Sequence, residues 1–382
     1  MQTEQNKVQK YKYEDTHWLK CERKPRFQRY EKYEHFEPIW TEYEDTNEMN
    51  NDCLVEKILK SETGCNIDGR AGTGKTHFCK RLIEKLKEQG KRIMVLAPTN
   101  KSAFIIGGIT YHKFFTSIKH NTKKMVNRLD YIFVDEISMI HERFYKAFLT
   151  LRKINPTPRF IMAGDFRQLE PVNDRIKNAN FKSAVLKQLC DHHRLTLTFC
   201  RRSDKELFQA SLNVKKIDPS LFQSKVGLIN LCYTNKMRHF LNQQCSDKFV
   251  RFKGKKKYHM VLKNGQKICC GMPLIASKTV GKLEICKNEM FKVIKCRKTK
   301  NEITVQSECG EKKMILTVEE VSNLFELAFA ITVHRSQGST IESPYCIFEW
   351  HLFSKKMKYV AITRATKLNH INIDTTPREQ YF

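Results

Sequence analysis

Eight consecutive residues, Gly69–Thr76, read G-R-A-G-T-G-K-T and fit the pattern G-x-x-x-x-G-K-[ST]. In a loop of this pattern the backbone N–H groups surround the phosphates of a nucleotide. Lys75 is expected to reach the β- and γ-phosphates, and the hydroxyl of Thr76 is expected to hold Mg²⁺. The predicted nucleotide-binding positions of the loop are Gly69, Gly72, Thr73, Gly74, Lys75 and Thr76.

A second group of candidate residues follows an apolar run further along the chain. Residues 131–134 read Y-I-F-V, and Asp135 and Glu136 come directly after them. Asp135 is expected to help hold Mg²⁺ through water, and Glu136 is placed to orient and deprotonate an attacking water molecule. Another apolar run, residues 160–164, leads to Gln168, which is expected to sense the γ-phosphate or the attacking water. Together with the glycine-rich loop, these side chains predict a bound nucleotide and Mg²⁺.

Strands and a helix must bring these side chains together. Residues 65–68 predict the end of a short buried strand, and apolar residues at helical spacing follow the loop until Gly90. Strand, glycine-rich loop and helix N-terminus place oriented amides and a positive dipole end at an anion. Residues 92–96 predict a second buried strand. The sequence therefore predicts an α/β nucleotide-binding unit.

A second α/β unit is expected to begin near Leu195. Residues 250–322 differ in character, with short β-rich segments and turns such as Asn264-Gly265. They predict a small barrel inserted into the second unit. The predicted elements of the second unit itself are strands at 195–199 and 226–232, the segment 328–340, and a final helix that carries residues 358–366.

Charge and composition limit the classes of function. The chain of 382 residues has a formal net charge of +28, and residues 1–52 hold three more acids than bases, so residues 53–382 carry +31. A basic excess of this size points to a polyanion, most simply a nucleic acid. No apolar run has the ~20 residues of a membrane span, and no secretory signal precedes the chain. The 14 cysteines lack C-x-x-C spacing, which disfavours a structural metal and favours reduced thiols in an intracellular protein.

Residues 1–52 form a segment apart, mixed in charge and rich in aromatic residues. Five aromatic side chains recur at helical spacing, interrupted by Pro38. We expect this stripe to dock on the main body, and an independent module for a nucleic acid or a replication-protein partner is the alternative. The stripe consists of Tyr30, Tyr33, Phe36, Trp40 and Tyr43.

Four motifs, in order, resemble those of superfamily 1 helicases, and most closely the 5′-to-3′ branch of PIF (petite integration frequency) and RecD-like proteins. They are D-E-I-S-M from Asp135, G-D-F-R-Q-L-E-P-V from Gly164, V-H-R-S-Q-G-S-T from Val333 and Y-V-A-I-T-R-A-T from Tyr359. The resemblance covers about residues 53–373. It implies an α/β fold of two RecA-like P-loop NTPase domains, with a small SH3-like β-barrel inserted in the second. The implied divisions are the extension 1–52, a first domain 53–190, a second domain 191–249 and 323–382, and the inserted domain 250–322.

The resemblance also implies roles for individual residues. Lys75, Thr76, Asp135, Glu136 and Gln168 match the first domain's half of an ATP site. The second domain is expected to contribute Gly338, the arginine Arg364 at the start of a helix, and a second arginine, for which Arg201 is preferred and Arg202 stays open. The residues that match strand-binding motifs are Thr99, Asn100, Thr110, His112, Phe114, Thr332, His334 and Ser336. Phe114 is the expected base-stacking residue.

These expectations predict an ATP-dependent 5′-to-3′ DNA helicase that acts on single-stranded DNA and tailed duplexes in replication, repair or recombination. The nucleus or a viral or mobile-element replication site would suit it. An RNA helicase, a binding scaffold with weak ATPase activity and a small-molecule kinase are the alternatives. The sequence departs from the family in two places. The nearest glutamine upstream of the phosphate loop is Gln28, which bears on preference for ATP, and only residues 116–128 are available for a strand-splitting wedge.

Overall fold

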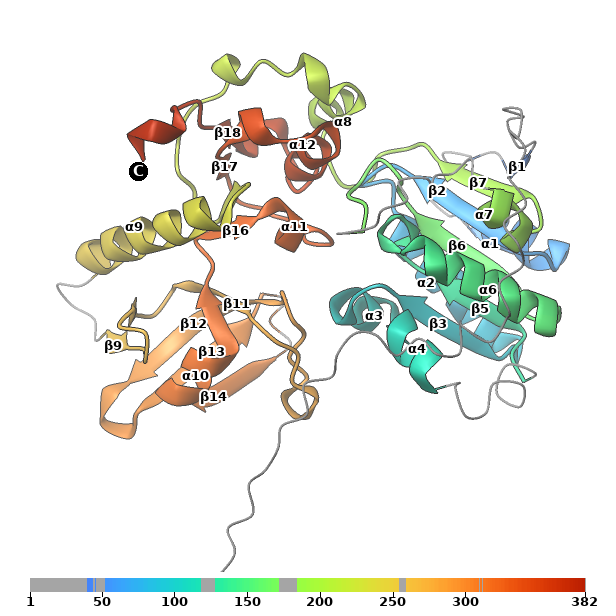
Figure 1. Cartoon of the computed structure of the whole chain (residues 1–382), viewed down its shortest axis with the longest axis horizontal. Helices are drawn as coiled ribbons and strands as arrows, with labels where there is room; N and C mark the ends of the chain where they lie inside the picture. The colour runs from blue at the N-terminus through green and yellow to red at the C-terminus, as the bar shows by residue number, and fades with distance from the viewer. Residues whose placement is uncertain are drawn as a thin grey trace, which may run out of the picture.

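A computed structural model of the chain shows three units, each with its own sheet. The structure describes residues 40–43, 45, 52–117, 128–171, 184–253, 259–308, 310 and 312–381. In these residues no helix is both long and apolar enough to cross a membrane. Figure 1 shows the first unit on the right, the second at the upper left and the insert at the lower left.

The first unit is a parallel sheet of seven strands in the order β1-β7-β2-β6-β5-β3-β4. Its central strands are buried along their whole length, as expected for a sheet covered on both faces. The strands are β1 (Thr41–Tyr43), β2 (Cys65–Gly69), β3 (Ile93–Ala97), β4 (Ile109–Thr110), β5 (Tyr131–Val134), β6 (Arg159–Gly164) and β7 (His193–Leu197).

Helices cover both faces of this sheet. Side chains of β5 alternate between two cores, because successive residues of a strand point to opposite faces. Tyr131 and Phe133 pack with α1, α2 and α3, and Ile132 and Val134 pack with α4, α6 and α7. The helices are α1 (Asp52–Ser61), α2 (Lys75–Glu88), α3 (Asn100–Ile106), α4 (Tyr111–Ser117), α6 (Glu142–Ile154) and α7 (Ala184–Leu189).

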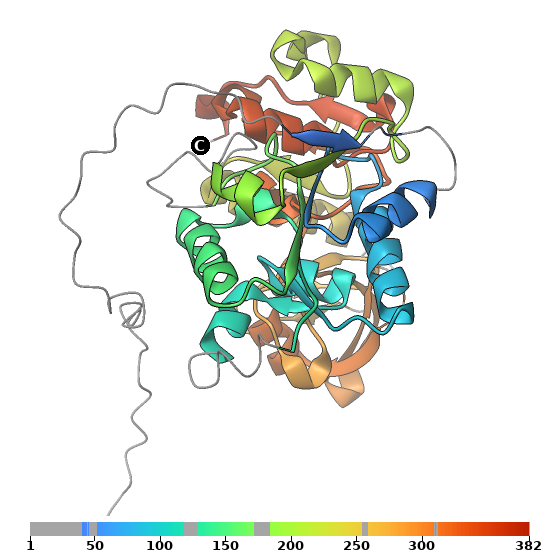
Figure 2. The same cartoon turned by 90° about the vertical axis from the view of Figure 1, so that its right-hand side faces the viewer.

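The edge of the first sheet corrects two predictions. β7 pairs in parallel with β2, so the strand around Leu195 belongs to the first unit and does not open the second. β1 extends the same edge by pairing with β7, as seen in Figure 2, so residues 41–43 are a strand where the aromatic spacing predicted a helix. Trp40 and Tyr43 pack against the two cores, which confirms docking for these residues. Tyr30, Tyr33 and Phe36 lie outside the described residues.

The second unit is a smaller parallel sheet in the order β16-β8-β17-β18. The predicted strand at 226–232 is confirmed only at its end, and the final helix ends at Ile362, two residues before Arg364. The strands are β8 (Asn230–Cys232), β16 (Ala330–Thr332), β17 (Tyr345–Ile347) and β18 (Ile371–Ile373), and the helices are α8 (Lys205–Leu212), α9 (Asn235–Lys253), α11 (Val333–Ser336) and α12 (Lys355–Ile362).

The insert is an antiparallel sheet in the order β14-β13-β12-β11-β15, beside a two-stranded hairpin that turns at Asn264-Gly265. Its predicted end at residue 322 is too early, because β15 closes the sheet by pairing with β11. The elements are β9 (Met260–Val261), β10 (Lys267–Ile268), β11 (Pro273–Ala276), β12 (Met290–Arg297), β13 (Glu302–Ser307), β14 (Lys313–Thr317), α10 (Val318–Leu324) and β15 (Phe325–Leu327).

Candidate active site

The glycine-rich loop connects β2 to α2 at the carboxyl edge of the first sheet. Gly72 and Gly74 have φ of 85° and 84°, a left-handed conformation that glycine adopts without strain. At Gly69 a Cβ atom would lie 2.6 Å from the Thr73 hydroxyl oxygen. These glycines allow the backbone to curl tightly ahead of the helix N-terminus, which is the geometry of an anion site.

Some side chains of the glycine-rich loop stabilise the loop, and others face the cleft. The Nζ atom of Lys75 donates to the carbonyls of Gly69 and Arg70, at 2.6 and 2.9 Å. Thr73 is buried and its hydroxyl donates to the Arg70 carbonyl at 2.8 Å, so this side chain stabilises the loop. Thr76 is exposed and lines the cleft.

Two acids follow β5, directly beside the loop. Burial and the neighbouring Glu136 raise the pKa of Asp135 to about 7, and burial also raises the pKa of Glu136. Glu136 adopts a φ of 48°, which is uncommon for a residue with a side chain. Its Oε2 atom is buried, and no hydrogen-bond partner for it lies within the described residues. An acid held in this way is available to accept a proton or a bond from a bound molecule.

The oxygen donors here fit Mg²⁺. Magnesium prefers oxygen ligands and usually binds through one or two carboxylates together with nucleotide phosphates. Asp135 and Thr76 both line the cleft and supply such oxygens. The buried, unpartnered oxygen of Glu136 beside them adds negative charge at the same place.

Asp165 follows β6 and organises the residues after it. Its Oδ1 accepts from the backbone and Nε of Arg167, at 3.1 and 2.6 Å, and its Oδ2 accepts from Nε2 of Gln168 at 3.5 Å. Burial alone would raise the pKa of Asp165, but Lys75 and Arg167 hold it below the usual value. Gln168 therefore lies beside a charged carboxylate at the carboxyl edge of the sheet.

Arg364 enters the cleft from the second unit. It lies just beyond the C-terminal end of α12, so the prediction that it starts a helix is wrong. Its guanidinium is buried and donates to the carbonyls of Val360 and Ser339, at 3.0 and 2.9 Å. Burial and the nearby Arg202 lower the pKa of Arg364 to about 10, so the group stays charged at neutral pH.

Arg201 and Arg202 both lie against the glycine-rich loop. The N–H of Arg201 donates to the Gly72 carbonyl at 2.8 Å, and its Cδ would be 3.2 Å from a Cβ on Gly74. Arg202 instead donates to the Thr363 carbonyl at 2.6 Å and to the Thr340 hydroxyl at 3.3 Å. The side chain of Arg202 is therefore bound to Thr363, the residue before Arg364, and to Thr340, whereas the side chain of Arg201 is more exposed.

A cleft of about 460 Å³ joins these groups. Both α/β units line it, with the glycine-rich loop and acids on one side and Arg364 and Gly338 on the other. The structure thus brings together most of the predicted nucleotide-site residues. The lining includes Gly72, Gly74, Lys75, Thr76, Asp135, Glu136, Gln168, Arg201, Arg202, Gly338 and Arg364.

The sequence predicted no role for three further residues that lie at the cleft or next to it. The buried Nε2 of Gln337 has no hydrogen-bond partner among the described residues. Lys101 crosses from the first unit and donates to the Ser339 hydroxyl at 2.6 Å. Tyr359 contacts the glycine-rich loop from the second unit. Gln337 and Tyr359 lie in recognised motifs, but only the tertiary structure shows where their side chains point.

The predicted strand-binding residues divide by exposure. Thr99, Asn100, His112 and His334 are exposed, and burial lowers the pKa of both histidines, which favours their neutral forms. Thr99 also caps α3 by accepting from the Ser102 N–H at 3.1 Å. The amide of Asn100 donates to the Thr279 hydroxyl of the insert at 3.1 Å, which places α3 against that unit.

Three of the predicted strand-binding side chains are turned into the protein. Phe114 is 0% exposed and packs within the first unit's core, 5.3 Å from the Phe115 ring, so the prediction that it stacks on a base is wrong. Ser336 is also 0% exposed, and its hydroxyl donates to the Val333 carbonyl at 2.8 Å. Thr332 is largely buried at the N-terminal end of α11. Thr110 is half-buried and accepts from the Lys113 N–H at 3.2 Å.

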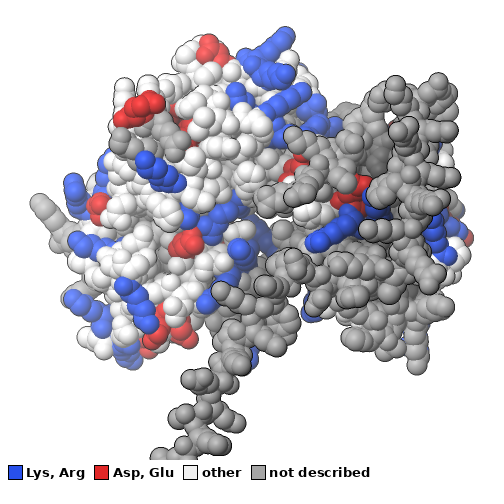
Figure 3. Space-filling view, in the orientation of Figure 1, with Lys and Arg blue, Asp and Glu red and all other residues white. Residues whose placement is uncertain are grey.

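Basic side chains gather where the units meet. Figure 3 shows Lys and Arg around the hollow at the centre of the face, with few acids beside them. Arg335 and Lys287 line the cleft near this place, on the second unit and the insert. A surface of this charge attracts a polyanion.

Comparisons with known proteins agree with this site. A family model described as an AAA domain matches residues 51–228. The ATP-dependent DNA helicase Pif1 of Campylobacter jejuni is 25% identical over 411 residues, which cover 85% of this chain and 91% of the relative. Other curated Pif1-type relatives of this chain are longer. In PIF1 from Trypanosoma brucei brucei, for example, the matched part is 17% of that protein.

Solved structures share the fold. Bacteroides Pif1 bound to ssDNA superposes with a TM-score of 0.62 at 21% identity, covering 88% of this chain and 94% of that one. Pif1 helicase from Candida albicans gives 0.63 at 17% identity, covering 88% and 97%. Two parallel sheets with an antiparallel insert are thus the architecture of Pif1 structures. With these matches and the motifs gathered at one cleft, the chain is similar over most of its length to Pif1-type DNA helicases and shares their fold.

Proposed function

We propose that this chain is an ATP-driven helicase that moves 5′ to 3′ along single-stranded DNA and separates tailed duplexes. The observation that carries the proposal is the cleft, where Lys75 and Glu136 of the first unit share one lining with Arg364 of the second. A site divided between two units can open and close, and this lets hydrolysis drive relative motion. Similarity to the ATP-dependent DNA helicase Pif1 of Campylobacter jejuni supports ATP-dependent DNA unwinding.

The first unit binds the nucleotide and prepares water for attack. Backbone amides of Gly72–Thr76 and the Lys75 ammonium bind the β- and γ-phosphates. Thr76 and Asp135 hold Mg²⁺, which neutralises charge on the phosphate oxygens when bound. Glu136 accepts the proton of the attacking water, because its buried carboxylate has a raised pKa and an unpartnered oxygen. Gln168, beside Asp165, orients that water.

The second unit completes the site when the cleft closes. Arg364 lies on the opposite side of the cleft, where a guanidinium meets the negative charge that develops on the γ-phosphate. Arg201 is the second arginine of the proposal, because Arg202 is bonded to the Thr363 carbonyl. Gly338 lines the same side and allows the nucleotide to approach the backbone.

We propose that the DNA strand crosses the basic face between the two units and the insert. Thr99, Asn100, His112 and His334 are its candidate contacts, because their side chains are exposed. A Bacteroides relative is bound to ssDNA, and another structure concerns forked dsDNA. Small polar groups of this kind contact phosphates without reading sequence.

The finer architecture is part of the same proposal. The two parallel sheets correspond to RecA-like domains, the first running through β7, and the antiparallel insert corresponds to an SH3-like barrel that ends with β15. Residues 1–52 are the candidate region for a replication-protein partner. Action on DNA places the protein inside cells, at a site of replication or repair.

A directional unwinding assay tests the proposal. Duplexes of DNA or RNA with a 5′ or a 3′ single-stranded tail are incubated with ATP, and strand release is measured. We expect release from DNA with a 5′ tail. Release only from 3′-tailed DNA would contradict the direction, and release only from RNA would favour the alternative of an RNA helicase.

Lys75→Ala separates the two functions of the protein. The variant should lose nearly all ATP hydrolysis, because the lysine binds the phosphates, and should keep DNA binding within about threefold of the wild type. Lys80→Ala, on the exposed side of α2, is the control and should change neither. Equal loss of hydrolysis and DNA binding in Lys75→Ala would refute separate sites.

A further inference from the structure

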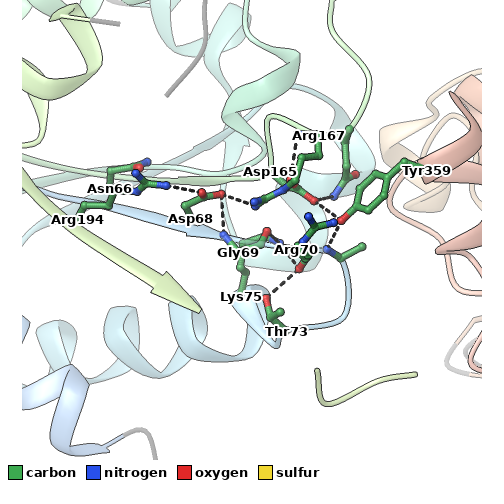
Figure 4. A network of polar contacts seen from close by, with 12 residues as sticks. Asn66, Asp68, Gly69, Arg70, Thr73, Lys75, Asp165, Arg167, Arg194 and Tyr359 are labelled. Carbon is green, nitrogen blue, oxygen red and sulfur yellow. Dashed lines mark hydrogen bonds and ion pairs between the residues drawn. The ribbon is translucent and has the colours of Figure 1, made fainter. Parts of the chain in front are cut away.

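One tyrosine joins the two α/β units at the glycine-rich loop. Tyr359 belongs to α12 of the second unit and is 3% exposed. Its hydroxyl donates to Oδ2 of Asp165 at 2.8 Å and accepts from the N–H of Ala71, also at 2.8 Å. Figure 4 shows the ring reaching from the second unit across to Asp165 of the first unit.

Both partners of the hydroxyl are buried parts of the nucleotide site. Ala71 is the third residue of the glycine-rich loop and is 8% exposed, and Asp165 is 0% exposed at the end of β6. A buried N–H or carboxylate that loses its partner destabilises the arrangement that buries it. The hydroxyl is therefore satisfied only when the second unit sits against the loop in this position.

The first-unit side of this contact is a connected set of charges. Arg167 donates to Asp165 and, at 2.8 Å, to Asp68, and Arg194 donates to Asp68 at 2.7 Å. Asp68 also accepts from the N–H of Gly69, the first residue of the loop, at 2.7 Å. The network drawn in Figure 4 thus fixes the ends of β2 and β6 relative to each other and offers Asp165 to Tyr359.

On the second-unit side, Arg202 and Arg364 are hydrogen-bonded to residues that lie within about one turn of Tyr359. The Thr363 hydroxyl donates to the Tyr359 carbonyl at 2.8 Å, and Arg202 donates to the Thr363 carbonyl. Nε of Arg364 donates to the carbonyl of Val360, the residue next to Tyr359. A change in the position of Tyr359 therefore moves the anchors of both arginines.

We propose that Tyr359 is a positioning residue that aligns Arg364 with the phosphate loop when the two units close. Its ring sets the distance between α12 and the loop, and its hydroxyl closes a bridge from Ala71 to Asp165. The inference rests on the proposed ATP hydrolysis, and it adds the residue that fixes the position of the second unit relative to the glycine-rich loop.

Other contacts between the units are weaker candidates for this role. Lys356 forms an ion pair with Glu170, but both side chains are more than a third exposed, and such pairs contribute little. Arg70 donates to the Ser211 carbonyl of α8 at 3.2 Å, and neither residue lines the cleft. Tyr359 differs because both of its hydroxyl partners belong to the site.

Tyr359→Phe tests the hydroxyl with the ring in place, and Tyr345→Phe is the matched control. Tyr345 is also fully buried, but its hydroxyl donates to the Ala361 carbonyl at 2.5 Å, within the second unit. Tyr359→Phe loses two buried hydrogen bonds and Tyr345→Phe loses its bond to Ala361, so the melting temperature should fall in both variants and at least as far in Tyr359→Phe. Only Tyr359→Phe should lower kcat of DNA-stimulated ATP hydrolysis, by about tenfold, with KM within about threefold.

A double variant shows whether Tyr359 acts through Arg364. In an Arg364→Lys background, Tyr359→Phe should lower kcat by less than about twofold, because the group that it positions is already gone. An equal tenfold loss in both backgrounds would overturn the inference, as would equal kcat values for Tyr359→Phe and Tyr345→Phe. If the wild-type protein shows no DNA-stimulated hydrolysis, the proposed function fails, and the comparison of variants is not reached.

Discussion

The charged guanidinium of Arg364 is buried within the protein itself. Its guanidinium makes hydrogen bonds to carbonyls of Val360 and Ser339, and burial lowers its pKa to about 10. Burying a cation is unfavourable unless hydrogen bonds compensate, and the planar group can make several in fixed directions. The side chain is thus oriented in advance toward the cleft that it shares with Lys75 and Glu136.

Arg364→Lys should reduce DNA-stimulated ATP turnover by about a hundredfold or more, whereas nucleotide affinity should fall far less. A lysine keeps the charge but cannot bond two carbonyls and the phosphate in one plane. Steady-state hydrolysis and binding of a fluorescent ADP analogue measure the two effects.

Arg238→Lys is the matched control for this change. Arg238 is another buried arginine of the second unit, paired with Glu326 at 2.5 Å and absent from the cleft lining. It should lose stability without a comparable loss of turnover. Turnover of Arg364→Lys within about threefold of the wild type would show that Arg201 or Arg202 carries the role alone.

At the scale of elements, α10 connects β14 to β15, the last strand of the insert. Thr317 and Glu320 form a reciprocal cap at its start: the Glu320 N–H donates to the Thr317 hydroxyl, and the Thr317 N–H donates to the Glu320 carboxylate. These bonds satisfy donors that a helix start leaves open. Because β15 follows α10 directly, the cap also fixes where the insert's last strand begins.

Thr317→Ala should destabilise α10 by about 1 kcal/mol, measured as faster hydrogen exchange of its amides. The Thr317 hydrogen bonds lower the pKa of Glu320, so the stabilisation is present above the unfolded-state pKa and is lost as pH falls through the lowered folded-state pKa. The difference between wild type and Thr317→Ala should therefore shrink on acidification.

Ser354→Ala serves as the control for the cap. Ser354 caps α12 by accepting from the Met357 N–H at 3.3 Å, so its loss should alter exchange in α12 and leave α10 unchanged. Identical exchange of α10 in wild type and Thr317→Ala would show that the cap contributes nothing measurable.

At the scale of the whole molecule, three units surround a basic hollow (Figure 3). α3 belongs to the first unit but also contacts the insert, through Asn100 and through Phe104, whose ring lies 4.2 Å from Nζ of Lys312. A strand that crosses this face would touch all three units. Movement between units would then change its contacts, which is how hydrolysis becomes translocation.

Binding to single-stranded DNA should weaken steeply with salt and should not depend on sequence. Each phosphate neutralised by Lys or Arg releases a counterion, so a log–log plot of affinity against salt should have a slope of about −0.7 per phosphate contacted. Titrations with oligonucleotides of increasing length measure it, and the slope should grow with length until the face is filled. A flat response would refute electrostatic binding by the basic face.

Contiguous motifs allowed the nucleotide site to be predicted from the sequence. The loop Gly69–Thr76 and the pair Asp135-Glu136 carry their geometry in neighbouring residues, because glycine conformations and strand ends are local properties. The order of the motifs also indicated the family, and from it two α/β units with an insert. Strand pairing was harder to predict from the sequence. The residues of β7 predict a strand, but its pairing with β2 depends on contacts with a segment far away in the sequence.

Tertiary packing decided which side chains of a motif face the cleft and which face the core. Phe114 and Ser336 lie in motifs that predicted DNA contacts, yet both are buried, because each belongs to a short helix, α4 or α11, that turns some of its side chains inward. Arg364 lies after α12, and Tyr359 on the same helix crosses to Ala71 and Asp165, contacts between residues nearly 200 and 300 positions apart. The sequence by itself predicted a nucleotide site and a resemblance to Pif1-type helicases, because these follow from residue types at short spacing. Only the tertiary structure decided how the two units meet, because that depends on surfaces formed after each unit has folded.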